Sequence, residues 1–378
     1  MLPAGFPSKT SLADVLSSCL AAMTGTRPTI PIPEVQRAVV VLVDGLGAQA
    51  LRARSGHARF LGLRLTKSST IDSGSPTTTA SAIATLCTGR MPGEHGIVGY
   101  RGFDPDTDRV FNHLSGWTGS PPPATWQLCE TVFEQAAPLG VSAYAVGPER
   151  YRSSSYTAAV LRGAEYIGAS SMERRVELVR ELFDRGGKRL VYLYVPELDV
   201  AAHAEGSEST SWLIALEELD SVMSMLARTL RSGEGAFVTA DHGILDVPSS
   251  SHVLYDSVPE LTDGVAHVGG DPRMLQLYLP AGSTNDDEAA LAAAWRDAEG
   301  HRSWVASRAE AIEAGWFGPE VDAAVAPRIG NVLVAARARI AYYDSKPENA
   351  KSRRMVGQHG SLTPEEQKVP LVRLGAFE

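Results

Sequence analysis

Cysteine is scarce in this sequence of 378 residues, which contains only three. Cys19, Cys87 and Cys129 are an odd number, and none forms a CxxC pair or lies in a cysteine-rich stretch. Spacings typical of a disulfide framework are therefore missing. We predict that all three are reduced residues of the protein core.

Positive charge is in deficit, because 35 Lys and Arg residues face 44 Asp and Glu residues, for a net charge of −9. Proteins that bind nucleic acids usually carry a basic surface that neutralises phosphates. We therefore expect no nucleic-acid polymer as a partner. Small phosphate esters are still compatible with this charge, since bound metal ions would supply positive charge locally.

Long hydrophobic runs are also missing, and none approaches the roughly 18 apolar residues of a membrane span. Near the N-terminus Asp14 interrupts the apolar stretch, and Lys9 is the sole basic residue before it. Apolar residues recur there at helical spacing, as Leu12, Val15, Leu16, Cys19, Leu20 and Met23. This pattern favours an amphipathic helix over an exported leader. We expect a cytoplasmic protein without a membrane partner.

Short β-branched runs alternate with helical patterns along the first two thirds of the chain. The runs are AVVVLVD at 38–44, VSAYAVG at 141–147, RLVYLYVP at 189–196 and GAFVTAD at 235–241. Helices are expected over Met172–Arg185 and Glu208–Leu230. Nearly continuous apolar strands between helices indicate an α/β fold, whose mostly parallel central sheet carries helices on both faces.

The pattern changes after residue 254. PRMLQLYLP is typical of a strand, DDEAALAAAWRDA of an acidic helix, and RIGNVLVAARARIAYY of one or two further strands. We predict a small inserted α+β cap over 255–345, with a metallohydrolase core formed by 1–254 and 346–378. The core would then carry chemistry on both sides of the insertion.

Seven scattered residues are of the types that hold divalent metal ions or act beside them. They are Asp44, Thr79, Asp199, His203, Asp241, His242 and His359. Carboxylates and imidazoles are ordinary ligands of zinc and its neighbours, so three aspartates and three histidines would suit two ions. A hydroxyl beside such ions becomes a nucleophile, which indicates hydrolysis of a phosphorus ester.

Each of these residues also has a simpler interpretation. Asp44 follows an apolar strand, where an aspartate often only caps a helix or forms a turn. Asp199 and His203 lie four residues apart and would share one helical face, but LDVAAH could equally be a solvated helix start. His359 alone would be an ordinary loop histidine. It gains interest as the missing third ligand of a second ion.

These blocks resemble the alkaline phosphatase superfamily, in its type I phosphodiesterase and nucleotide pyrophosphatase branch. The resemblance extends from Asp44 to His359. It implies that Asp44, Thr79, Asp241 and His242 hold one metal ion. It further implies that Asp199, His203 and His359 hold the second.

The choice of nucleophile also depends on this resemblance. In the superfamily the nucleophile lies at a helix N-terminus, ten residues before the glycine of a Thr-Gly pair. Gly89 then indicates Thr79, with Thr78 as the second choice. The run ASAIATLCTG is compatible with a helix, so Thr79 would meet free backbone N–H groups. Alternatively, Thr77 to Thr79 only cap that helix.

Two departures from the family pattern concern the substrate. An aromatic-Pro-Asn sequence usually follows the nucleophile, but here Ala80-Ser81-Ala82 follows Thr79. The family also places a phosphate-binding asparagine after the HGI segment, where this chain has Tyr100. A tyrosine hydroxyl can donate one hydrogen bond but cannot replace an amide. We expect Tyr100 to contact the substrate, and both departures remove residues that the family pattern associates with nucleotide substrates.

The resulting hypothesis is a two-metal hydrolase of phosphodiester or nucleotide pyrophosphate bonds, acting through a phospho-threonine intermediate. Its cofactors would be two divalent ions, zinc or alternatively manganese. A phosphomonoesterase or phosphonate hydrolase would share the same residues, and a metal- or phosphate-binding protein without activity is the alternative of another class. The sequence carries no signal for an oligomeric state.

Overall fold

A seven-stranded sheet forms the centre of the computed structural model, which describes residues 2–5, 10–117 and 123–378. Its strand order is β2 (Thr70–Asp72), β17 (Lys368–Gly375), β8 (Glu234–Thr239), β1 (Arg37–Val43), β7 (Lys188–Val195), β5 (Val141–Gly147) and β6 (Glu165–Gly168). Strands β8, β1, β7, β5 and β6 run parallel, and β17 is antiparallel to β8. The predicted α/β class with a mostly parallel sheet is confirmed.

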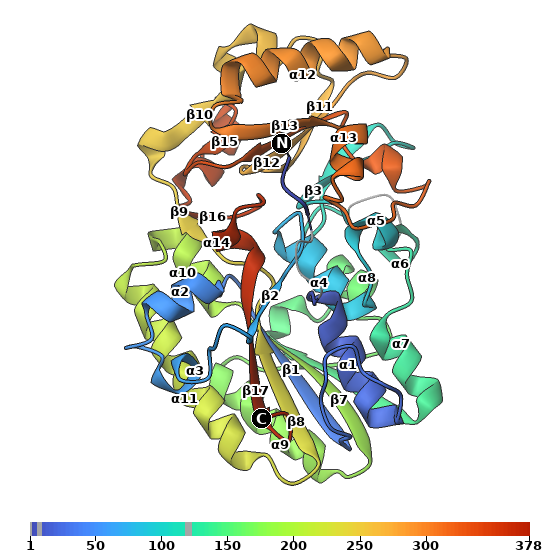
Figure 1. Ribbon diagram of the computed structural model, residues 1–378, viewed down its shortest axis with the longest axis vertical. Coiled ribbons are helices and arrows are strands. Elements are labelled where there is room, and N and C mark those ends of the chain that lie inside the picture. The colour runs from blue at the N-terminus through green and yellow to red at the C-terminus, as the bar shows by residue number, and fades with distance from the viewer. Residues whose placement is uncertain (1, 6–9, 118–122) are drawn as a thin grey trace.

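Helices flank this sheet on both sides (Figure 1). One group consists of α1 (Ala13–Thr24), α4 (Thr79–Thr88) and α7 (Val132–Ala136), and the other of α9 (Met172–Asp184), α10 (Glu197–Glu205) and α11 (Thr210–Thr229). Ser171 and Ser209 cap α9 and α11, where their hydroxyls accept bonds from first-turn N–H groups. Because both sheet faces are covered, every residue of β1 from Ala38 to Val43 is fully buried.

A second, antiparallel sheet lies at the other end of the molecule (Figure 1). Its order is β13 (Ser303–Ser307), β14 (Val332–Ala336), β12 (Met274–Tyr278), β11 (His267–Asp271), β3 (Arg101–Asp104) and β4 (Arg109–Asn112). Helix α12 (Asn285–Glu299) packs on β13 and β14. Strands β3 and β4 therefore belong to the second sheet although they lie outside residues 255–345. The boundaries of the cap stay a prediction.

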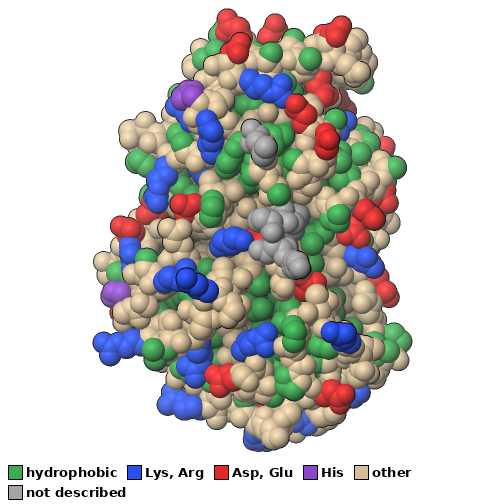
Figure 2. Space-filling view, viewed as in Figure 1, with side chains coloured by type: hydrophobic (Ala, Val, Ile, Leu, Met, Phe, Trp, Pro, Cys, Tyr) green, Lys and Arg blue, Asp and Glu red, His purple; other side chains and the backbone are tan. Residues whose placement is uncertain are grey.

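Acidic side chains gather at the end of the molecule formed by α12 (Figure 2). Helix α12 begins with Asp286, Asp287 and Glu288, and Thr284 caps it. Carboxylates in a first turn are favourable there because they face the positive end of the helix dipole. This acidic end lies away from the central sheet, on the outer side of the second sheet (Figure 1).

The N-terminal segment forms α1, as its helical spacing predicted. Cys19 on α1 and Cys87 on α4 are free and buried. Cys129 is free but only half-buried, so its assignment to the core was wrong. It lies in the connection between α6 (Pro123–Trp126) and α7, where its backbone N–H bonds the Gln127 side chain at 2.5 Å. Within the described residues, no helix combines the length and the apolar character that crossing a bilayer requires.

Candidate functional site

The candidate site lies at the carboxyl ends of the central parallel strands. Asp44 directly follows β1, α10 with Asp199 and His203 follows β7, and Asp241 follows β8. Ligands of open α/β sheets bind at this edge because the loops after neighbouring strands converge there. The topology therefore brings together residues that are almost 200 positions apart.

Asp44, Asp241 and His242 form the first group of potential metal ligands. One atom from each side chain lies within 4.8 Å of the others. The Nε2 atom of His242 is 3.5 Å from Asp44 Oδ1 and 3.4 Å from Asp241 Oδ2. Asp241 is held in place by the backbone N–H groups of Gly45, at 3.1 Å, and His242, at 2.9 Å.

Asp199, His203 and His359 form the second group, in which one atom from each side chain again lies within 4.8 Å of the others. The Nε2 atom of His203 is 3.2 Å from Asp199 Oδ2, one helical turn away on α10. The two groups are adjacent, because the His242 and His359 rings stack with centroids 3.7 Å apart. The three aspartates and three histidines predicted as ligands thus meet in one place, and their role in metal binding stays a prediction.

Backbone carbonyls fix the orientation of all three histidines. The Nδ1 atoms of His203, His359 and His242 lie 2.8 Å from Gly357 O, 2.8 Å from Thr77 O and 3.2 Å from Gly243 O. A carbonyl oxygen only accepts, so each Nδ1 carries the proton. Each Nε2 lone pair is then free to bind a metal ion, as in many metal sites whose histidines bond a carbonyl.

The carboxylates of the site fit divalent cations. Buried oxygens of Asp44, Asp199 and Asp241 have no hydrogen-bond partner among the described residues. Burial, together with the charges of Asp241 and Asp199, raises the pKa of Asp44 well above its usual range. Burial also raises the pKa of Asp241. Buried anions that repel one another need a positive partner, and two cations would supply it.

Asp199 and His359 respond differently to the same surroundings. Burial alone would raise the pKa of Asp199, but His203, together with His359 and His242, outweighs burial and holds this pKa below its usual range. Burial and the neighbouring His242 and His203 lower the pKa of His359 well below its usual value. His359 is therefore neutral at physiological pH, which is the form that binds metals.

Thr79 is the first residue of α4, and its Oγ1 atom lies 3.2 Å from His242 Nε2. The preceding residue, Thr78, adopts an extended backbone and makes no side-chain cap bond to the helix. The first-turn N–H groups of α4 therefore have no side-chain cap and can bind an anion. Thr79 thus combines a hydroxyl, the nearby first ligand group and an anion-binding helix end.

A two-strand ladder brings His359 to the site from near the end of the chain. Strand β9 (Leu245–Asp246), just after the Asp241-His242 pair, bonds to β16 (Gly357–Gln358), just before His359. Helix α10 joins the same ladder, because Val356 N–H donates to His203 O at 2.9 Å. One small element thereby fixes all three loops relative to one another.

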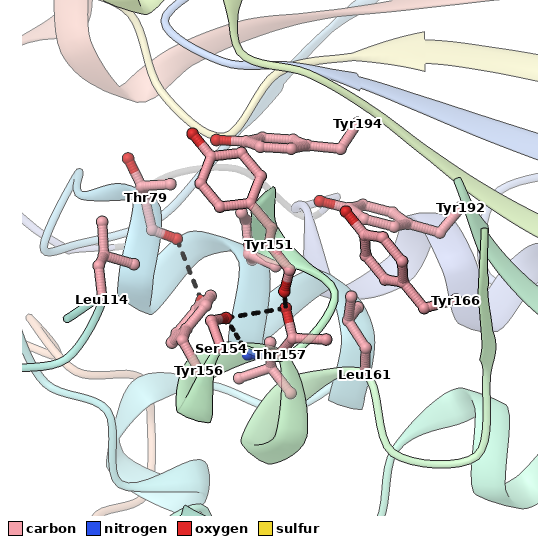
Figure 3. A pocket seen from close by; sticks show the side chains of 12 residues that line it. Thr79, Leu114, Tyr151, Ser154, Tyr156, Thr157, Leu161, Tyr166, Tyr192 and Tyr194 are labelled. Atoms are coloured by element: carbon pink, nitrogen blue, oxygen red, sulfur yellow. Dashed lines mark hydrogen bonds between the residues drawn. The ribbon is translucent and has the colours of Figure 1, made fainter. Parts of the chain in front are cut away.

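A pocket of about 100 Å³ opens beside Thr79 and is lined mainly by aromatic side chains (Figure 3). Its tyrosines are Tyr151, Tyr156, Tyr166, Tyr192 and Tyr194. The Tyr194 hydroxyl donates a short hydrogen bond to Asp44 Oδ2. None of these tyrosines was predicted from the sequence as a site residue. The alternation of Tyr192 and Tyr194 on β7, which places both on one face just before Asp199, was an available signal.

Tyr100 lies apart from this pocket. It lines a different cavity of about 280 Å³, which is formed by β3 and β11 of the second sheet and by β15 (Ala341–Tyr343), together with Asp271 at the end of β11. The Tyr100 backbone N–H donates to Asp271 Oδ2 at 3.4 Å, and its hydroxyl interacts with Asn112. No contact described in the structure joins Tyr100 to Thr79, and its contact with substrate stays a prediction.

Comparison with known proteins gives a consistent assignment. The family model for type I phosphodiesterase / nucleotide pyrophosphatase matches residues 38–362. Mouse ectonucleotide pyrophosphatase/phosphodiesterase family member 3 is 27% identical over 218 residues, which cover 54% of this chain and 24% of that protein. An uncharacterised pyrophosphatase/phosphodiesterase of Schizosaccharomyces pombe is 25% identical over 192 residues, covering 48% and 39%. The chain thus spans well under half the length of these curated relatives.

Solved structures share the fold at low sequence identity. Murine ectonucleotide pyrophosphatase/phosphodiesterase 5, as an inactive variant in complex with AMP, superimposes with a TM-score of 0.67 at 17% identity. The match covers 89% of this chain and 87% of that one. Phosphonoacetate hydrolase from Sinorhizobium meliloti, in complex with phosphonoacetate, gives a TM-score of 0.67 at 18% identity, covering 90% and 91%.

Proposed function

Because this chain belongs to the type I phosphodiesterase / nucleotide pyrophosphatase family, we propose that it hydrolyses phosphodiester or nucleotide pyrophosphate bonds. One observation carries this proposal. The Thr79 hydroxyl lies at the N-terminus of α4 and 3.2 Å from His242, beside two compact groups of carboxylates and histidines. The arrangement combines a nucleophile, sites for cations and an anion-binding helix end.

Two divalent ions, most simply zinc, would complete the site. Asp44, Asp241, His242 and Thr79 would hold one, and Asp199, His203 and His359 the other. Such ions, when bound, lower the pKa of a hydroxyl and stabilise the charge of the transferred phosphoryl group. The orphaned carboxylate oxygens support this assignment, as do the three histidines, whose Nδ1 atoms donate to backbone carbonyls and leave Nε2 as the ligand atom.

The protein's own groups would position the reaction in two steps. In the first, Thr79 Oγ1 bonds to phosphorus while the bond from phosphorus to the leaving alcohol oxygen breaks, and the alcohol takes up a proton. The N–H groups at the start of α4 bind a non-bridging oxygen. In the second, a water oxygen bonds to phosphorus, the bond to Thr79 breaks, and Thr79 regains its proton. Each step relies on positioning and charge stabilisation.

The tyrosine-lined pocket beside Thr79 would bind one organic group of the substrate. Its walls offer flat rings, with hydroxyls at their tips, so a planar or largely apolar group suits it (Figure 3). The murine structure that shares this fold binds AMP, which supports a nucleotide as one candidate substrate. Ala80 stands where the family pattern has an aromatic residue after the nucleophile. Rate measurements on substrates with and without a nucleobase would therefore establish whether the pocket prefers one.

Phosphonate or phosphomonoester hydrolysis is a second candidate. The fold is equally similar to phosphonoacetate hydrolase, and the small residues Ala80-Ser81-Ala82 depart from the nucleotide pyrophosphatase pattern. The same nucleophile and ligands would serve either reaction. The difference would lie in what surrounds the phosphoryl group.

Rates on three chromogenic substrates separate these functions. The protein is loaded with zinc and given bis(4-nitrophenyl) phosphate, 4-nitrophenyl phosphate and 4-nitrophenyl phenylphosphonate. We expect kcat/KM to be at least tenfold higher for the diester than for the monoester. A higher value for the monoester, or turnover of the phosphonate alone, would favour the second candidate.

Metal content tests the cofactor assignment independently of rate. Elemental analysis should find two ions per chain, and His203→Ala should reduce this number to about one. His301→Ala, at an exposed position outside the site, is the matched control and should retain two. Full activity after chelation would contradict the proposal.

A further inference from the structure

We propose that the cavity lined by Tyr100 and Asp271 binds the second substituent of the substrate, and that this substituent is neutral and rich in hydroxyl groups, such as glycerol or a sugar. The inference rests on the proposed diesterase function and narrows its substrate class. It assigns Asp271 as a specificity-determining residue. A phosphodiester has two organic groups, and the tyrosine-lined pocket at Thr79 accounts for only one.

The position of Asp271 connects this cavity to the reaction site. Asp271 is buried, and its Cβ packs so closely on Gly360 that an added Cβ there would lie 2.7 Å from it. Gly360 directly follows His359, and its N–H donates to the Thr77 hydroxyl at 3.1 Å. Burial raises the pKa of Asp271 to about 7, and the nearby hydroxyl of Thr78, next to the nucleophile, opposes this shift. The cavity therefore begins within one residue of both Thr79 and His359.

The polar groups of the cavity match a hydroxyl-rich substituent. A carboxylate can accept about four hydrogen bonds, and Tyr100 N–H approaches Asp271 only at 3.4 Å. Asp271 therefore retains acceptor capacity towards the cavity that it lines. Asn112 and Arg101 add donors to the same walls. Such a mixture of donors and acceptors suits hydroxyl groups, which both donate and accept.

The charge and the aromatic surface of the cavity also favour a neutral, hydroxyl-rich substituent. Its ionisable lining residues are Asp271, Asp344 and Arg101, and burial raises the pKa of Asp271 to about 7, so the lining carries no excess of positive charge. A further phosphate at this place would find no positive partner beyond Arg101, which disfavours a nucleotide pyrophosphate. Buried Tyr255 and Tyr343 contribute ring surface for the carbon skeleton of the ligand.

The test compares three diesters of 4-nitrophenyl phosphate that differ only in the second substituent. These are the 2,3-dihydroxypropyl, propyl and 2-carboxyethyl esters. We expect kcat/KM for the dihydroxypropyl ester to exceed that for the propyl ester by about tenfold, the effect of one charge-assisted hydrogen bond. The carboxyethyl ester should be the poorest of the three.

Substitutions test whether Asp271 causes the faster hydrolysis of the dihydroxypropyl ester. Asp271→Asn should reduce the ratio of kcat/KM between the dihydroxypropyl and propyl esters from about tenfold to about threefold. The kcat/KM for the propyl ester itself should change by less than about threefold. Asp104→Asn is the matched control, because Asp104 is also buried and lies on neighbouring β3 but does not line the cavity. It should retain the full preference.

The possible outcomes distinguish this inference from the proposed function. Equal rates of the unmodified protein on the dihydroxypropyl and propyl esters would overturn the inference and leave the diesterase proposal intact. Failure to hydrolyse any of the three diesters would overturn both. The comparison on the unmodified protein decides the question even where Asp271→Asn does not fold.

Discussion

At the scale of single residues, the contact between Tyr194 and Asp44 shows how the second layer of the site acts on the first. The Tyr194 hydroxyl donates to Asp44 Oδ2, while Asp44 Oδ1 has no hydrogen-bond partner among the described residues. The bond fixes the rotation of the carboxylate and directs its free oxygen towards His242, 3.5 Å away. Groups that orient metal ligands in this way tune metal affinity.

Tyr194→Phe removes this donor without changing the shape of the ring. We expect it to lower zinc affinity or kcat/KM by about tenfold or more, the usual effect of losing such a partner. Tyr192→Phe is the matched control, because Tyr192 lines the same pocket from the same strand. A titration that gives both variants the affinity of the unmodified protein would show that the Tyr194 hydroxyl has no orienting role.

The metal-ligand candidates that follow apolar strands could be predicted from the sequence, whereas the pocket-lining residues outside β7 could not. Asp44, Asp199 and Asp241 each follow an apolar strand, and parallel strands bring their carboxyl ends together. Tyr151 and Tyr166 lie on separate segments without a pattern that links them. Their approach to Thr79 depends on how α8 (Ser155–Val160) packs against α4, which is a tertiary contact.

At the scale of elements, α10 is held in place by a buried ion pair at its start. The Arg175 side chain is 1% exposed and bonds both carboxylate oxygens of Glu197, at 2.5 and 3.1 Å. Arg175 also donates to the backbone oxygens of Tyr194 and Ser170. It thereby joins α9, β7 and α10, and so positions the helix that carries Asp199 and His203.

Arg175→Met should therefore affect both stability and the second ligand group. We expect a loss of about 3 kcal/mol in the free energy of unfolding, because a partly buried carboxylate and several carbonyls lose their partner. Zinc affinity should fall together with stability. Urea unfolding and zinc titration measure the two effects.

Arg174→Met is the control for this variant. Arg174 lies next to Arg175 but is exposed and pairs with Glu177 and Glu181 at the surface. Surface pairs of this kind contribute little, so a change below about 1 kcal/mol is expected. Equal effects of the two substitutions would contradict the anchoring role of Arg175.

The strands and helices of the central sheet could be predicted because their residue patterns are local. The strands of the second sheet were harder to predict. Strands β1, β5, β7 and β8 and helices α9 and α11 agree with their predicted ranges within about two residues. The RGFD and RVFN segments of β3 and β4 are too short to show a period. They become strands because β3 pairs with β11, more than 160 residues later in the chain.

At the scale of the whole molecule, buried neutral histidines make stability depend on pH. His95 and His113 are fully buried near the start of the second sheet. Burial lowers the pKa of His95 to about 3 and that of His113 to about 4. Trp126 Nε1–H donates to His113 Nε2 at 3.0 Å, so protonation there would break a hydrogen bond.

The sign of the pH effect follows from these directions. Above the unfolded pKa of about 6.5 both states keep the histidines neutral. As the pH falls below 6.5, only the unfolded state takes up protons, and stability decreases until the folded-state pKa values near 4 and 3 are reached. Between pH 7 and 5 the loss is about 2 kcal/mol for each histidine, or about 4 kcal/mol together.

Urea unfolding at pH 7 and pH 5 measures this loss. His113→Gln should reduce the difference between the two pH values by about 2 kcal/mol, even though the variant is less stable at both. His301→Gln, at an exposed position, should leave the difference unchanged within about 0.5 kcal/mol. A difference that His113→Gln does not alter would contradict the assignment of the pH dependence to this histidine.

The central claim for the whole molecule is that Thr79 becomes covalently attached to phosphorus. Acid quenching of the zinc-loaded protein during turnover of bis(4-nitrophenyl) phosphate, followed by tryptic digestion, isolates the peptide 68–90. Fragmentation mass spectrometry should place a phosphoryl group, or its 4-nitrophenyl ester, on Thr79. Thr79→Ala should show no trapped group and should lose several orders of magnitude in rate. A group found on Thr78, or nearly normal turnover by Thr79→Ala, would contradict the account.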